Sequence, residues 1–421
     1  MREAKQPQIF EEGIMRSLLK LSLLFLFTVI LSLSLGAQIQ LVESVPVETN
    51  LGIEETGRTL DVWLDMIKGA QKTIDIEIFY LSAQKGEPLE EVINALKDAS
   101  SRSVSIRIIA DAKFANVYPE TLNLLDSLSN IEVERIELFN KMDGVQHSKY
   151  FIVDGEEIFL GSQNFDWRSL KHIHELGIRI HNKRLAEFIT KIFNLDWDLS
   201  KNTIETKIIR NITLPQSTII DQKNPVQINW QDEWISIYPT FTPKEDIFPG
   251  MPFDETQLLD LIGNATEKIY IQLLSYNPAD HGEYYPALEN ALRSAALRGV
   301  QVKLLVSDWN KSKPGVGYLK SLQVLPNIEV KFSTLPQYSG GFIPFARVEH
   351  CKYMVVDDSL TWIGTANWAK NYFYASRNLG LVIKGKSVNS IVQKVFLKSW
   401  NGDYTYFIDP SKEYQVPRIG E

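Results

Sequence analysis

Two stretches of the chain carry the same succession of helical and extended apolar patterns. Residues 60–82 and 258–276 each show apolar positions at helical spacing that run into a segment rich in β-branched residues. Residues 89–111 and 288–308 follow with a second helix-like and strand-like pattern in the same order. Strands that alternate with helices predict a mixed or parallel sheet covered by helices on both faces. The pattern therefore predicts two copies of one α/β domain.

The offset between the two copies is close to 200 residues. Ala70 corresponds to Ala265 at an offset of 195, and Val104 corresponds to Val300 at an offset of 196. Solenoid repeats recur every ~20 to 50 residues, so this spacing indicates duplicated domains instead. We expect the two domains to form a pseudo-twofold pair, with a functional site at their interface that takes one set of groups from each half.

The chain is expected to divide into four parts. Residues 1–37 are predicted to be a leader, 38–200 the first domain, 201–254 a connection and 255–421 the second domain. The connection is rich in Asn, Thr, Pro and Gln, and strand-like runs within it indicate that it is structured. Trp230 and Trp234 are expected to anchor it by packing.

The leader has the pattern of a secretory signal. Residues 21–35 are mostly apolar, Arg16 and Lys20 precede them, and the small residues Gly36 and Ala37 follow. The same segment is long enough to act as an uncleaved signal-anchor, which would make the membrane a partner. Both readings predict the secretory pathway: passage through the endoplasmic reticulum and Golgi to the endolysosome, or secretion.

The charge and the cysteine content argue against several classes of protein. The 421 residues carry 44 basic and 52 acidic side chains, a net charge of −8, which argues against a broad basic surface for duplex DNA. The single cysteine, Cys351, excludes an intramolecular disulfide framework and a Cys-rich zinc site. The chain has only 6 histidines, and two of them belong to the motif described next.

Each half contains one copy of a motif with the form H-x-K-x4-D, followed by Gly-Ser/Thr-x-Asn. The internal spacings of the two copies are identical. The first copy comprises His147, Lys149, Asp154, Ser162 and Asn164, and the second comprises His350, Lys352, Asp357, Thr365 and Asn367. A polar residue before Leu-Gly follows each histidine by 28 positions, namely Glu175 and Asn378. One such motif could arise by chance, but two matched copies are a strong signal.

The residue types suit an anionic phosphodiester. Residues two apart in a strand face the same side, so each histidine is expected to project together with the lysine of its motif. Two such sets would provide two imidazoles, two ammonium groups, two hydroxyls and two amides. The cations and amides can stabilise charge on a pentavalent phosphorus. One imidazole can attack phosphorus while the other donates a proton to the leaving oxygen. No metal and no cofactor are implied by this set of groups.

The doubled motif resembles that of the phospholipase D superfamily, and the resemblance extends over nearly the whole chain after the leader. It implies two tandem phospholipase D-like α-β-α sandwich domains related by pseudo-twofold symmetry, with the active site at their interface. It also implies a metal-independent phosphodiesterase that forms a covalent phosphohistidine. Within this scheme we expect His147 to be the nucleophile and His350 the general acid and base.

This assignment rests on Glu175. We expect its carboxylate to accept the Nδ1 proton of His147, and Asn378 to orient His350 without adding charge. Asp154 and Asp357 are interpreted as structural residues, and Cys351 as a core thiol on the opposite side of its strand. His172 and His174 form the only local histidine pair, which is interpreted as a surface or supporting pair and not as a metal site.

Stretches around the motifs resemble the animal endolysosomal branch of the superfamily, the phospholipase D three and four type. They include GSQNFDWRSL at 161–170 and IGTANWAKNYF at 363–373. The resemblance implies a 5′ exonuclease on single-stranded DNA or RNA. A phospholipase D or phosphatidyltransferase acting on phospholipids is the first alternative, because it would use the same residues. A non-catalytic membrane or envelope protein of the same fold is the second.

Further side chains are candidates for accessory roles. Aromatic residues directly after the motifs are candidates for stacking against a substrate, namely Trp167, Trp368, Tyr372 and Phe373. Three sequons are candidates for glycosylation, at Asn211, Asn264 and Asn310. A second copy of the chain is a candidate partner. The lone cysteine departs from the disulfide-containing branch and indicates a distant member.

Overall fold

The structure is a computed structural model that describes residues 38–420 except 205, 210, 213, 281 and 282. The predicted leader at 1–37 lies outside the described residues. Among the helices that the structure describes, none combines the length and the apolar character needed to cross a bilayer. Residues 39–421 form one compact unit, and the description below concerns this unit.

The first half is built around an eight-stranded mixed sheet. Its strand order is β2-β1-β10-β8-β7-β3-β5-β6. The central strand β3 runs parallel to β5 and antiparallel to β7. The strands are β1 (Ile39–Ser44), β2 (Gly57–Arg58), β3 (Thr73–Ile78), β5 (Ser105–Asp111), β6 (Ile131–Ile136), β7 (Tyr150–Val153), β8 (Glu157–Gly161) and β10 (Glu175–His181).

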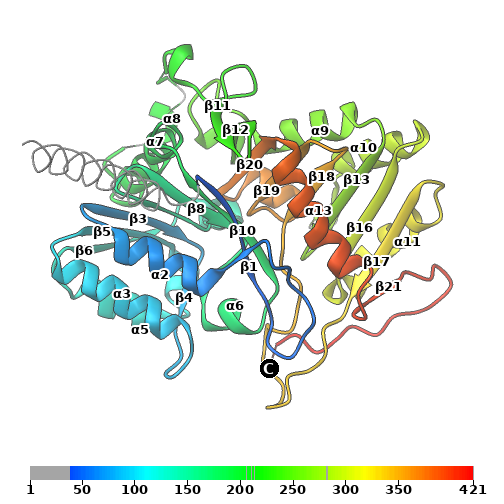
Figure 1. The fold of residues 1–421 in the computed structure, drawn as a ribbon, viewed down its shortest axis with the longest axis horizontal. Coiled ribbons are helices and arrows are strands. Elements are labelled where there is room, and N and C mark those ends of the chain that lie inside the picture. Colours follow the sequence, from blue (N-terminus) through cyan, green and yellow to red (C-terminus); the bar gives the residue numbers. More distant parts are fainter. Residues whose placement is uncertain (1–37, 205, 210, 213, 281–282, 421) are drawn as a thin grey trace, which may run out of the picture. The chain divides into compact units, whose positions relative to one another are not determined.

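Helices cover both faces of this sheet (Figure 1). The helices are α2 (Thr59–Gly69), α3 (Leu89–Ser101), α4 (Ala112–Ala115), α5 (Pro119–Asp126), α6 (Trp167–Lys171) and α7 (Lys183–Ser200). Helix α2 shows why: Val62, Trp63, Met66 and Ile67 recur on one side and are buried. Trp63 stacks on Phe165 and also meets two further phenylalanines edge-on, which fixes the helix on the sheet.

The second half repeats this arrangement around a nine-stranded sheet. Its strand order is β11-β12-β20-β19-β18-β13-β16-β17-β21. The strands are β11 (Val226–Trp230), β12 (Glu233–Thr242), β13 (Lys268–Leu273), β16 (Gln301–Ser307), β17 (Ile328–Ser333), β18 (Tyr353–Val356), β19 (Leu360–Gly364), β20 (Asn378–Lys384) and β21 (Thr405–Phe407). The main helices are α9 (Asp254–Asn264), α10 (Ala287–Leu297), α11 (Gly315–Gln323), α12 (Lys370–Tyr374) and α13 (Lys386–Trp400).

The two halves match element by element. The order β10-β8-β7-β3-β5-β6 of the first sheet corresponds to β20-β19-β18-β13-β16-β17 of the second. In both sheets the motif strand, β7 or β18, lies antiparallel to the central strand. Figure 1 shows the two sheets side by side, with β10 and β20 turned toward the middle of the unit. The repeated pattern of the sequence therefore reflects a duplicated sheet.

The predicted connection is structured and supplies two strands. β11 and β12 extend the second sheet, because β12 pairs with β20 from Ser236–Lys384 to Thr242–Asn378. The second sheet thus begins well before residue 255. Trp230 packs partly buried against the core as expected, but the expectation for Trp234 is wrong, since this residue alternates to the outer face of β12 and is 66% exposed.

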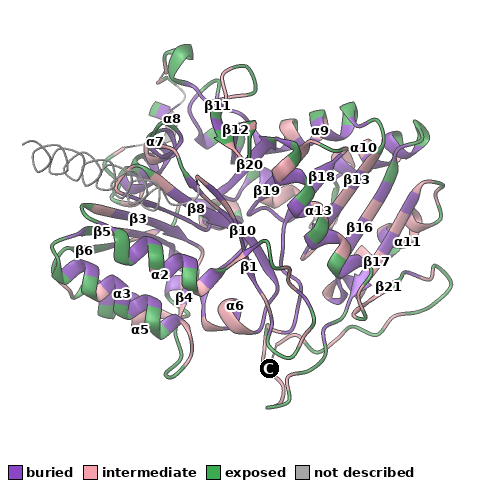
Figure 2. Ribbon diagram, viewed as in Figure 1, coloured by how far each residue is buried: buried purple, intermediate pink, exposed green. Residues whose placement is uncertain are grey.

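Buried residues run through the centre of the unit, where the halves meet (Figure 2). One contiguous apolar cluster includes α7 of the first half together with the sheet of the second. The backbones of the two halves also approach each other closely at Gly144. A Cβ at this position would lie 2.1 Å from the carbonyl oxygen of Ala375. Only glycine allows the two backbones to come this close.

Candidate active site

Each motif histidine lies immediately before a short buried strand. His147 and Lys149 precede β7, and His350 and Lys352 precede β18. All four side chains are largely buried. The Nζ atom of Lys149 donates to the carbonyl oxygen of His147 at 2.6 Å, and Lys352 does the same to His350 at 2.7 Å. Each lysine is thereby folded back onto its own histidine, as the two-residue spacing predicts.

Backbone hydrogen bonds join the two motifs across the interface in a symmetric way. The amide of His147 donates to the carbonyl of Arg377 at 2.9 Å, and the amide of Arg377 donates to Val145 at 3.0 Å. In the equivalent place, the amide of His350 donates to the carbonyl of His174 at 2.7 Å. The amide of His174 in turn donates to Val348 at 3.0 Å. We call these two contacts the Arg377 seam and the His174 seam.

The polar partners of the histidines are crossed between the halves. Nδ1 of His350 lies 2.7 Å from Oε2 of Glu175, and Nδ1 of His147 lies 3.1 Å from Oδ1 of Asn378. The expectation that Glu175 would serve His147 is therefore wrong. Each seam places the residue that follows Arg377 or His174 against the histidine of the other half. The partner of a histidine is thus chosen by the interface and not by proximity in the chain.

Both partners are held by further hydrogen bonds. The Oγ atom of Ser169 donates to Oε1 of Glu175 at 2.5 Å. The amide nitrogen of Asn378 donates to the carbonyl of Tyr372 at 2.8 Å, and its Oδ1 accepts from Thr365 at 3.0 Å. Because Oδ1 faces His147, Nδ1 of His147 must carry the proton. The Nε2 atom of each histidine is then free to meet a substrate.

The two histidines differ in how readily they are protonated. Burial lowers the pKa of His147 well below its ordinary value, and the nearby Lys149 and Lys352 lower it further. Burial also lowers the pKa of His350, but here Glu175 opposes the shift. Burial alone would raise the pKa of Glu175, whereas His350 and Lys352 hold it below its ordinary value. The imidazole of His350 is therefore the easier of the two to protonate.

Burial also affects the lysines. It lowers the pKa of Lys352 to about 7 and that of Lys149 well below its ordinary value. A phosphodiester anion between the lysines would favour their charged forms. Lys352 is therefore available as a cation to an anion near and below neutral pH.

The remaining motif residues divide into two groups. The side-chain oxygens of Asn164 and Asn367 are buried without a hydrogen-bond partner among the described residues, and both asparagines line the cavity described below. The amide NH2 of each is the group that can donate to an anion. Ser162 and Thr365 bond to the backbone of the following strand. Their role is to hold β10 and β20 in register.

Asp154 and Asp357 lie away from the histidines at the far ends of the motif strands. Asp154 accepts from the backbone amides of residues 71 to 73, at 2.7 to 2.9 Å. Asp357 accepts from the amides of residues 266 to 268. Each carboxylate therefore binds the backbone amides at the beginning of a central strand, β3 or β13. Cys351 is fully buried, with its thiol directed at the carbonyl of His174.

A cavity of about 360 Å³ opens above the two histidines. It is lined by both halves and contains His147, His350, Asn164 and Asn367. Its walls are mostly aromatic. The aromatic residues are Phe79, Tyr80, Phe114 and Tyr118 from the first half, and Trp309, Phe345 and Tyr372 from the second. The hollow thus combines a polar floor with flat apolar sides.

The stacking candidates are only partly placed in this cavity. Tyr372 lines it, with its ring 4.9 Å from the His147 ring. Trp368 and Phe373 are buried in the core, so the expectation for these two residues is wrong. Trp167 packs on the first core and edge-on against His172, outside the cavity lining. Trp368 and Phe373 belong to the larger apolar core cluster, and Trp167 packs against the smaller one.

Most of the aromatic wall lies at positions that the sequence motifs did not indicate. Phe79 and Tyr80 follow the end of β3, and Trp309 follows the end of β16. Phe114 belongs to α4, directly after β5. Aromatic residues at the carboxyl ends of predicted central strands were the available signal, because ligands bind at that edge of open α/β sheets. Arg168 was also missed; it lines the cavity and forms a salt bridge to Asp166 at 2.7 Å.

The sequons differ in access. Asn264 is exposed at the end of α9, and Asn211 is exposed too. Asn310 is only 7% exposed, and its amide nitrogen donates to the carbonyls of Leu274 and Ser307. A glycan cannot be attached to an amide that is bonded inside the fold, so the expectation for Asn310 is wrong.

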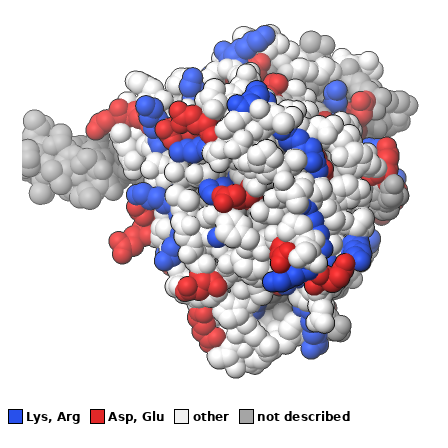
Figure 3. Space-filling model, turned by 90° about the vertical axis from the view of Figure 1, so that its right-hand side faces the viewer, with Lys and Arg blue, Asp and Glu red and all other residues white. Residues whose placement is uncertain are grey.

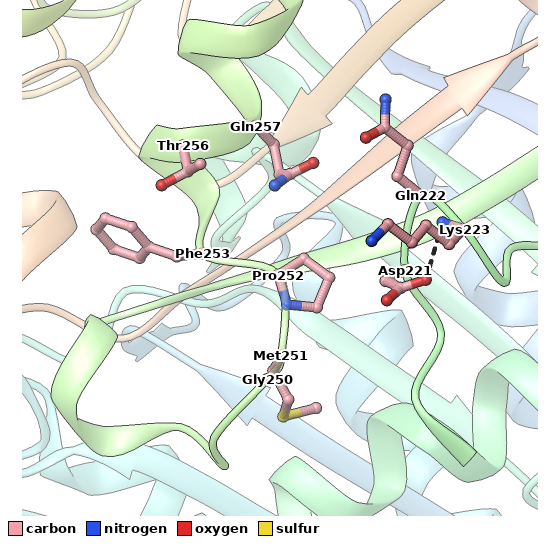
Figure 4. Close-up of a pocket in the computed structure, with 9 residues that line it drawn as sticks. All are labelled: Asp221, Gln222, Lys223, Gly250, Met251, Pro252, Phe253, Thr256 and Gln257. Atoms are coloured by element: carbon pink, nitrogen blue, oxygen red, sulfur yellow. Dashed lines mark hydrogen bonds between the residues drawn. The ribbon is translucent and has the colours of Figure 1, made fainter. Parts of the chain in front are cut away.

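Two other surface features lie away from this cavity. A hollow of about 310 Å³ lies between the connection and α9, where Lys223 and Asp221 face Gln257 (Figure 4). No histidine lines it. Figure 3 shows that basic and acidic side chains are interspersed on the face formed by the second half. The chemistry of a phosphodiesterase therefore concentrates in the cavity between the halves.

Comparisons with known proteins agree with this geometry. Residues 63–197 and 258–400 each match the family described as cardiolipin synthase, PLD-like domain. The chain is 33% identical over 408 residues to the 5′-3′ exonuclease PLD3 of Macaca fascicularis, covering 89% of this chain and 81% of that protein. It is 31% identical over 391 residues to phospholipase D Z of Dictyostelium discoideum, covering 88% and 91%.

The fold has a counterpart among solved structures. The phosphatidylserine synthase of Haemophilus influenzae matches with a TM-score of 0.57 and 15% identity. The match covers 83% of this chain and 85% of that one. At this level of identity the likeness concerns the fold alone.

Proposed function

The chain belongs to the phospholipase D superfamily of phosphodiesterases, and on that premise we propose that it removes nucleotides from the 5′ end of single-stranded DNA or RNA through a covalent phosphohistidine. The observation that carries the proposal is the cavity between the halves. It presents two histidines on its floor and aromatic rings on both of its sides.

We assign the nucleophile to His147 and the general acid to His350. A nucleophile must be neutral, and the side chain bonded to Nδ1 of His147 is an amide, that of Asn378. Two lysines near His147 also lower its pKa. A general acid must be protonated, and Glu175 favours the protonated form of His350. The roles are those expected from the sequence, but the physical basis is the opposite one: the carboxylate marks the acid.

The reaction then proceeds in two balanced steps. In the first, Nε2 of His147 attacks phosphorus, the bond to the leaving oxygen breaks, and Nε2 of His350 gives its proton to that oxygen. In the second, water attacks phosphorus, its proton passes to the neutral His350, and the bond between His147 and phosphorus breaks. Lys149 and Lys352 stabilise the charge on the equatorial oxygens, together with Asn164 and Asn367. The chain supplies every group that these steps need.

The choice of a nucleic acid rests on the aromatic walls. Each stacked base contributes ~1 to 3 kcal/mol of binding free energy, and every base offers a flat face. Residues from both halves supply such rings, among them Phe114 and Trp309. The relative in Macaca fascicularis is named a 5′-3′ exonuclease, which agrees with this choice.

A phospholipid substrate is the second candidate. The relative in Dictyostelium discoideum is named a phospholipase D, and its length is almost fully matched. The same histidines and lysines would act on the phosphate of a phospholipid.

We also propose passage through the secretory pathway, with a glycan on the exposed Asn264. Enzymatic removal of N-glycans from the expressed protein would test this proposal.

The decisive experiment compares substrates directly. The full chain is incubated with a 3′-labelled single-stranded oligonucleotide bearing a 5′-hydroxyl, and separately with phosphatidylcholine vesicles, at pH 5 and 7, with and without EDTA. Removal of nucleotides from the 5′ end that resists EDTA supports the proposal. Release of headgroups alone would establish the lipid candidate instead, and loss of activity with EDTA would contradict the metal-independent mechanism.

A further inference from the structure

His174 lies between two buried carboxylates that come from distant parts of the chain. Its Nε2 atom is 2.6 Å from Oε1 of Glu43 in β1, and its Nδ1 atom is 3.3 Å from Oε2 of Glu349, the residue before His350. The three side chains are each 1% exposed. We call this group the Glu43–His174–Glu349 bridge.

The contacts require a charged imidazole. A carboxylate can only accept hydrogen bonds, and a neutral imidazole carries one N–H. Both ring nitrogens of His174 face a carboxylate oxygen, so both must carry a proton for both contacts to be hydrogen bonds. The bridge therefore exists in its complete form only when His174 is an imidazolium ion.

Further donors surround both carboxylates. Glu43 also accepts from the hydroxyl of Thr56 at 2.7 Å and lies 3.5 Å from the guanidinium of Arg58. Glu349 also accepts from the hydroxyl of Ser333 at 3.0 Å and from the amide of Gln272. Both oxygens of Glu349 thus accept hydrogen bonds. The donors around Glu43 favour the ionised form of that carboxylate.

The other polar groups around the ring are few. The thiol of Cys351 lies 3.9 Å from Nδ1 of His174, and Tyr353 bonds to Gln272 next to Glu349. Glu175 is the next residue in the chain and is already bonded to His350. Arg58, half exposed at the rim, is the cation that lies next to the carboxylates. His174 is thus the buried cation of this group among the residues that the structure describes.

The bridge lies one residue behind the catalytic pair on both strands. His174 precedes Glu175, and Glu349 precedes His350, with the backbone of the His174 seam between them. The equivalent positions in the Arg377 seam are Gln146 and Arg377. Arg377 binds Asp196 at 2.6 Å and keeps its charge at every physiological pH. One seam therefore depends on a fixed cation and the other on a titratable one.

We propose that His174 is a positioning residue that makes the active site responsive to pH: its imidazolium holds Glu43 and Glu349 together and keeps Glu175 against His350, and loss of its proton loosens that contact. This inference rests on the proposed phosphodiesterase mechanism for its effect on the rate. It assigns the regulation of the site to a residue outside the doubled motif.

The pKa shifts of His174 and Glu43 determine at which pH the bridge is complete. Burial would lower the pKa of His174, but Cys351, Glu349 and Glu43 raise it well above the ordinary 6.5. Its stabilisation is therefore fully present below pH 6.5 and is lost as the pH rises through the raised value. Burial would raise the pKa of Glu43, but His174 and Thr56 hold it below 4.5, so its contribution is lost only in stronger acid. The bridge is complete in mildly acidic solution.

The first test compares rates across pH. Glu349→Gln keeps the shape of the side chain and removes one carboxylate of the bridge, and Glu132→Gln removes a carboxylate from an exposed pair with Lys201 as a matched control. With bis(4-nitrophenyl) phosphate as the probe, kcat of Glu349→Gln should be about tenfold below that of the wild type at pH 5, the cost of one charge-assisted hydrogen bond. The ratio should approach one at the pH where His174 has lost its proton.

Because Glu349 lies next to His350, the pH at which the ratio changes is compared with the pH at which the NMR signals of His174 and of His350 change, which separates the two titrations. A ratio that stays constant from pH 5 to a pH at which NMR shows that His174 has lost its proton would overturn the proposal, since a merely structural defect does not follow the protonation of His174. Glu43→Gln repeats the test from the other side of the ring if Glu349→Gln does not fold.

The second test needs no turnover and therefore separates this inference from the proposed function. With only 6 histidines in the chain, ¹⁵N-labelled imidazole signals can be assigned by NMR, using His174→Gln. His174 should keep both ring protons above pH 6.5, and the Nδ1–H signal of His350 should shift in Glu349→Gln but not in Glu132→Gln. A single ring proton on His174 from pH 5 to 8 would refute the bridge. Absence of all phosphodiesterase activity, with these signals as expected, would refute the proposed function alone.

Discussion

Nδ1 of His350 lies 2.7 Å from Oε2 of Glu175, although 175 residues of sequence separate them. In the same way, Asn378 in the second half orients His147 in the first. Each histidine thus receives its orientation from the other domain, and the charge of the partner differs between the two. This difference gives the site its chemical asymmetry.

Exchanging the charge of a partner should move one limb of the pH profile. Asn378→Asp places a carboxylate beside His147 and raises its pKa. Because the nucleophile must be neutral, the acidic limb of kcat/KM should move to higher pH. Glu175→Gln removes the carboxylate beside His350 and lowers its pKa, so the alkaline limb should move to lower pH. Profiles measured between pH 4 and 9 distinguish the limbs. Movement of the alkaline limb in Asn378→Asp and of the acidic limb in Glu175→Gln would reverse the assigned roles.

The covalent intermediate should be trapped when the general acid is removed. An ester of p-nitrophenol has a leaving group that needs no proton, so His350→Ala should still form the phosphohistidine but lack the base for its hydrolysis. We expect a burst of one equivalent of p-nitrophenolate, followed by a turnover rate ~10²- to 10⁴-fold below that of the wild type. Mass spectrometry should find the phosphoryl group on His147. His147→Ala should show no burst, and a burst from that variant would exclude His147 as the nucleophile.

Substrate capture should weaken as the pH rises through neutrality. The pKa of Lys352 is about 7, so the free protein loses this cation above that pH. Above pH 7, where the deprotonation of Lys352 limits binding, kcat/KM should fall by about tenfold for each pH unit. Lys352→Arg keeps the charge and should flatten this part of the profile, although its different shape will lower the rate at every pH. An unchanged profile in Lys352→Arg would show that another group controls the fall.

The aromatic wall should discriminate between substrates with and without bases. Trp309 lines the cavity and is partly exposed. Trp309→Ala should weaken the binding of a single-stranded oligonucleotide by ~1 to 3 kcal/mol, the contribution of one stacked base. Hydrolysis of bis(4-nitrophenyl) phosphate should change far less. Trp234→Ala serves as the control, because Trp234 is exposed outside the cavity. Equal losses with both substrates would argue against base stacking at this wall.

The Arg377 seam should contribute strongly to stability. Arg377 is buried and binds Asp196, which lies in the same buried group as Glu77. Arg377→Met should lower the free energy of unfolding by ~3 to 5 kcal/mol, because it leaves a buried carboxylate without its cation. Chemical denaturation measures this loss. Adding Asp196→Asn should restore much of the stability, whereas a further additive loss would mean that the pair is not coupled.

The sequence predicts the fold and the composition of the site well, for a physical reason. Helical and extended periodicities are local, and so is the two-residue spacing that brings Lys149 back onto His147. The two phospholipase D-like domains expected from the doubled motif are confirmed. The identical internal spacing of both motifs reflects two identical hairpins, β7–β8 and β18–β19.

The crossed partners could not be predicted in this way. Glu175 lies 28 positions from His147 and 175 from His350. Local sequence patterns do not determine how one sheet packs against the other. The same limitation explains Trp368 and Phe373, whose place next to the motif gave no information on which face they present. The buried position of His174 between two carboxylates could not be predicted either, because Glu43 and Glu349 are remote from it in the sequence.

The crossed partners also bear on why both halves reside in one polypeptide. Two separate copies of the first half would put Glu175 against the histidine of each neighbour, and the resulting homodimer would have two equivalent imidazoles. Joining the halves allows a single position to differ, with a carboxylate at 175 and an amide at 378. Covalent fusion is thus what lets a symmetric scaffold divide its labour, since each partner can then diverge without changing its twin.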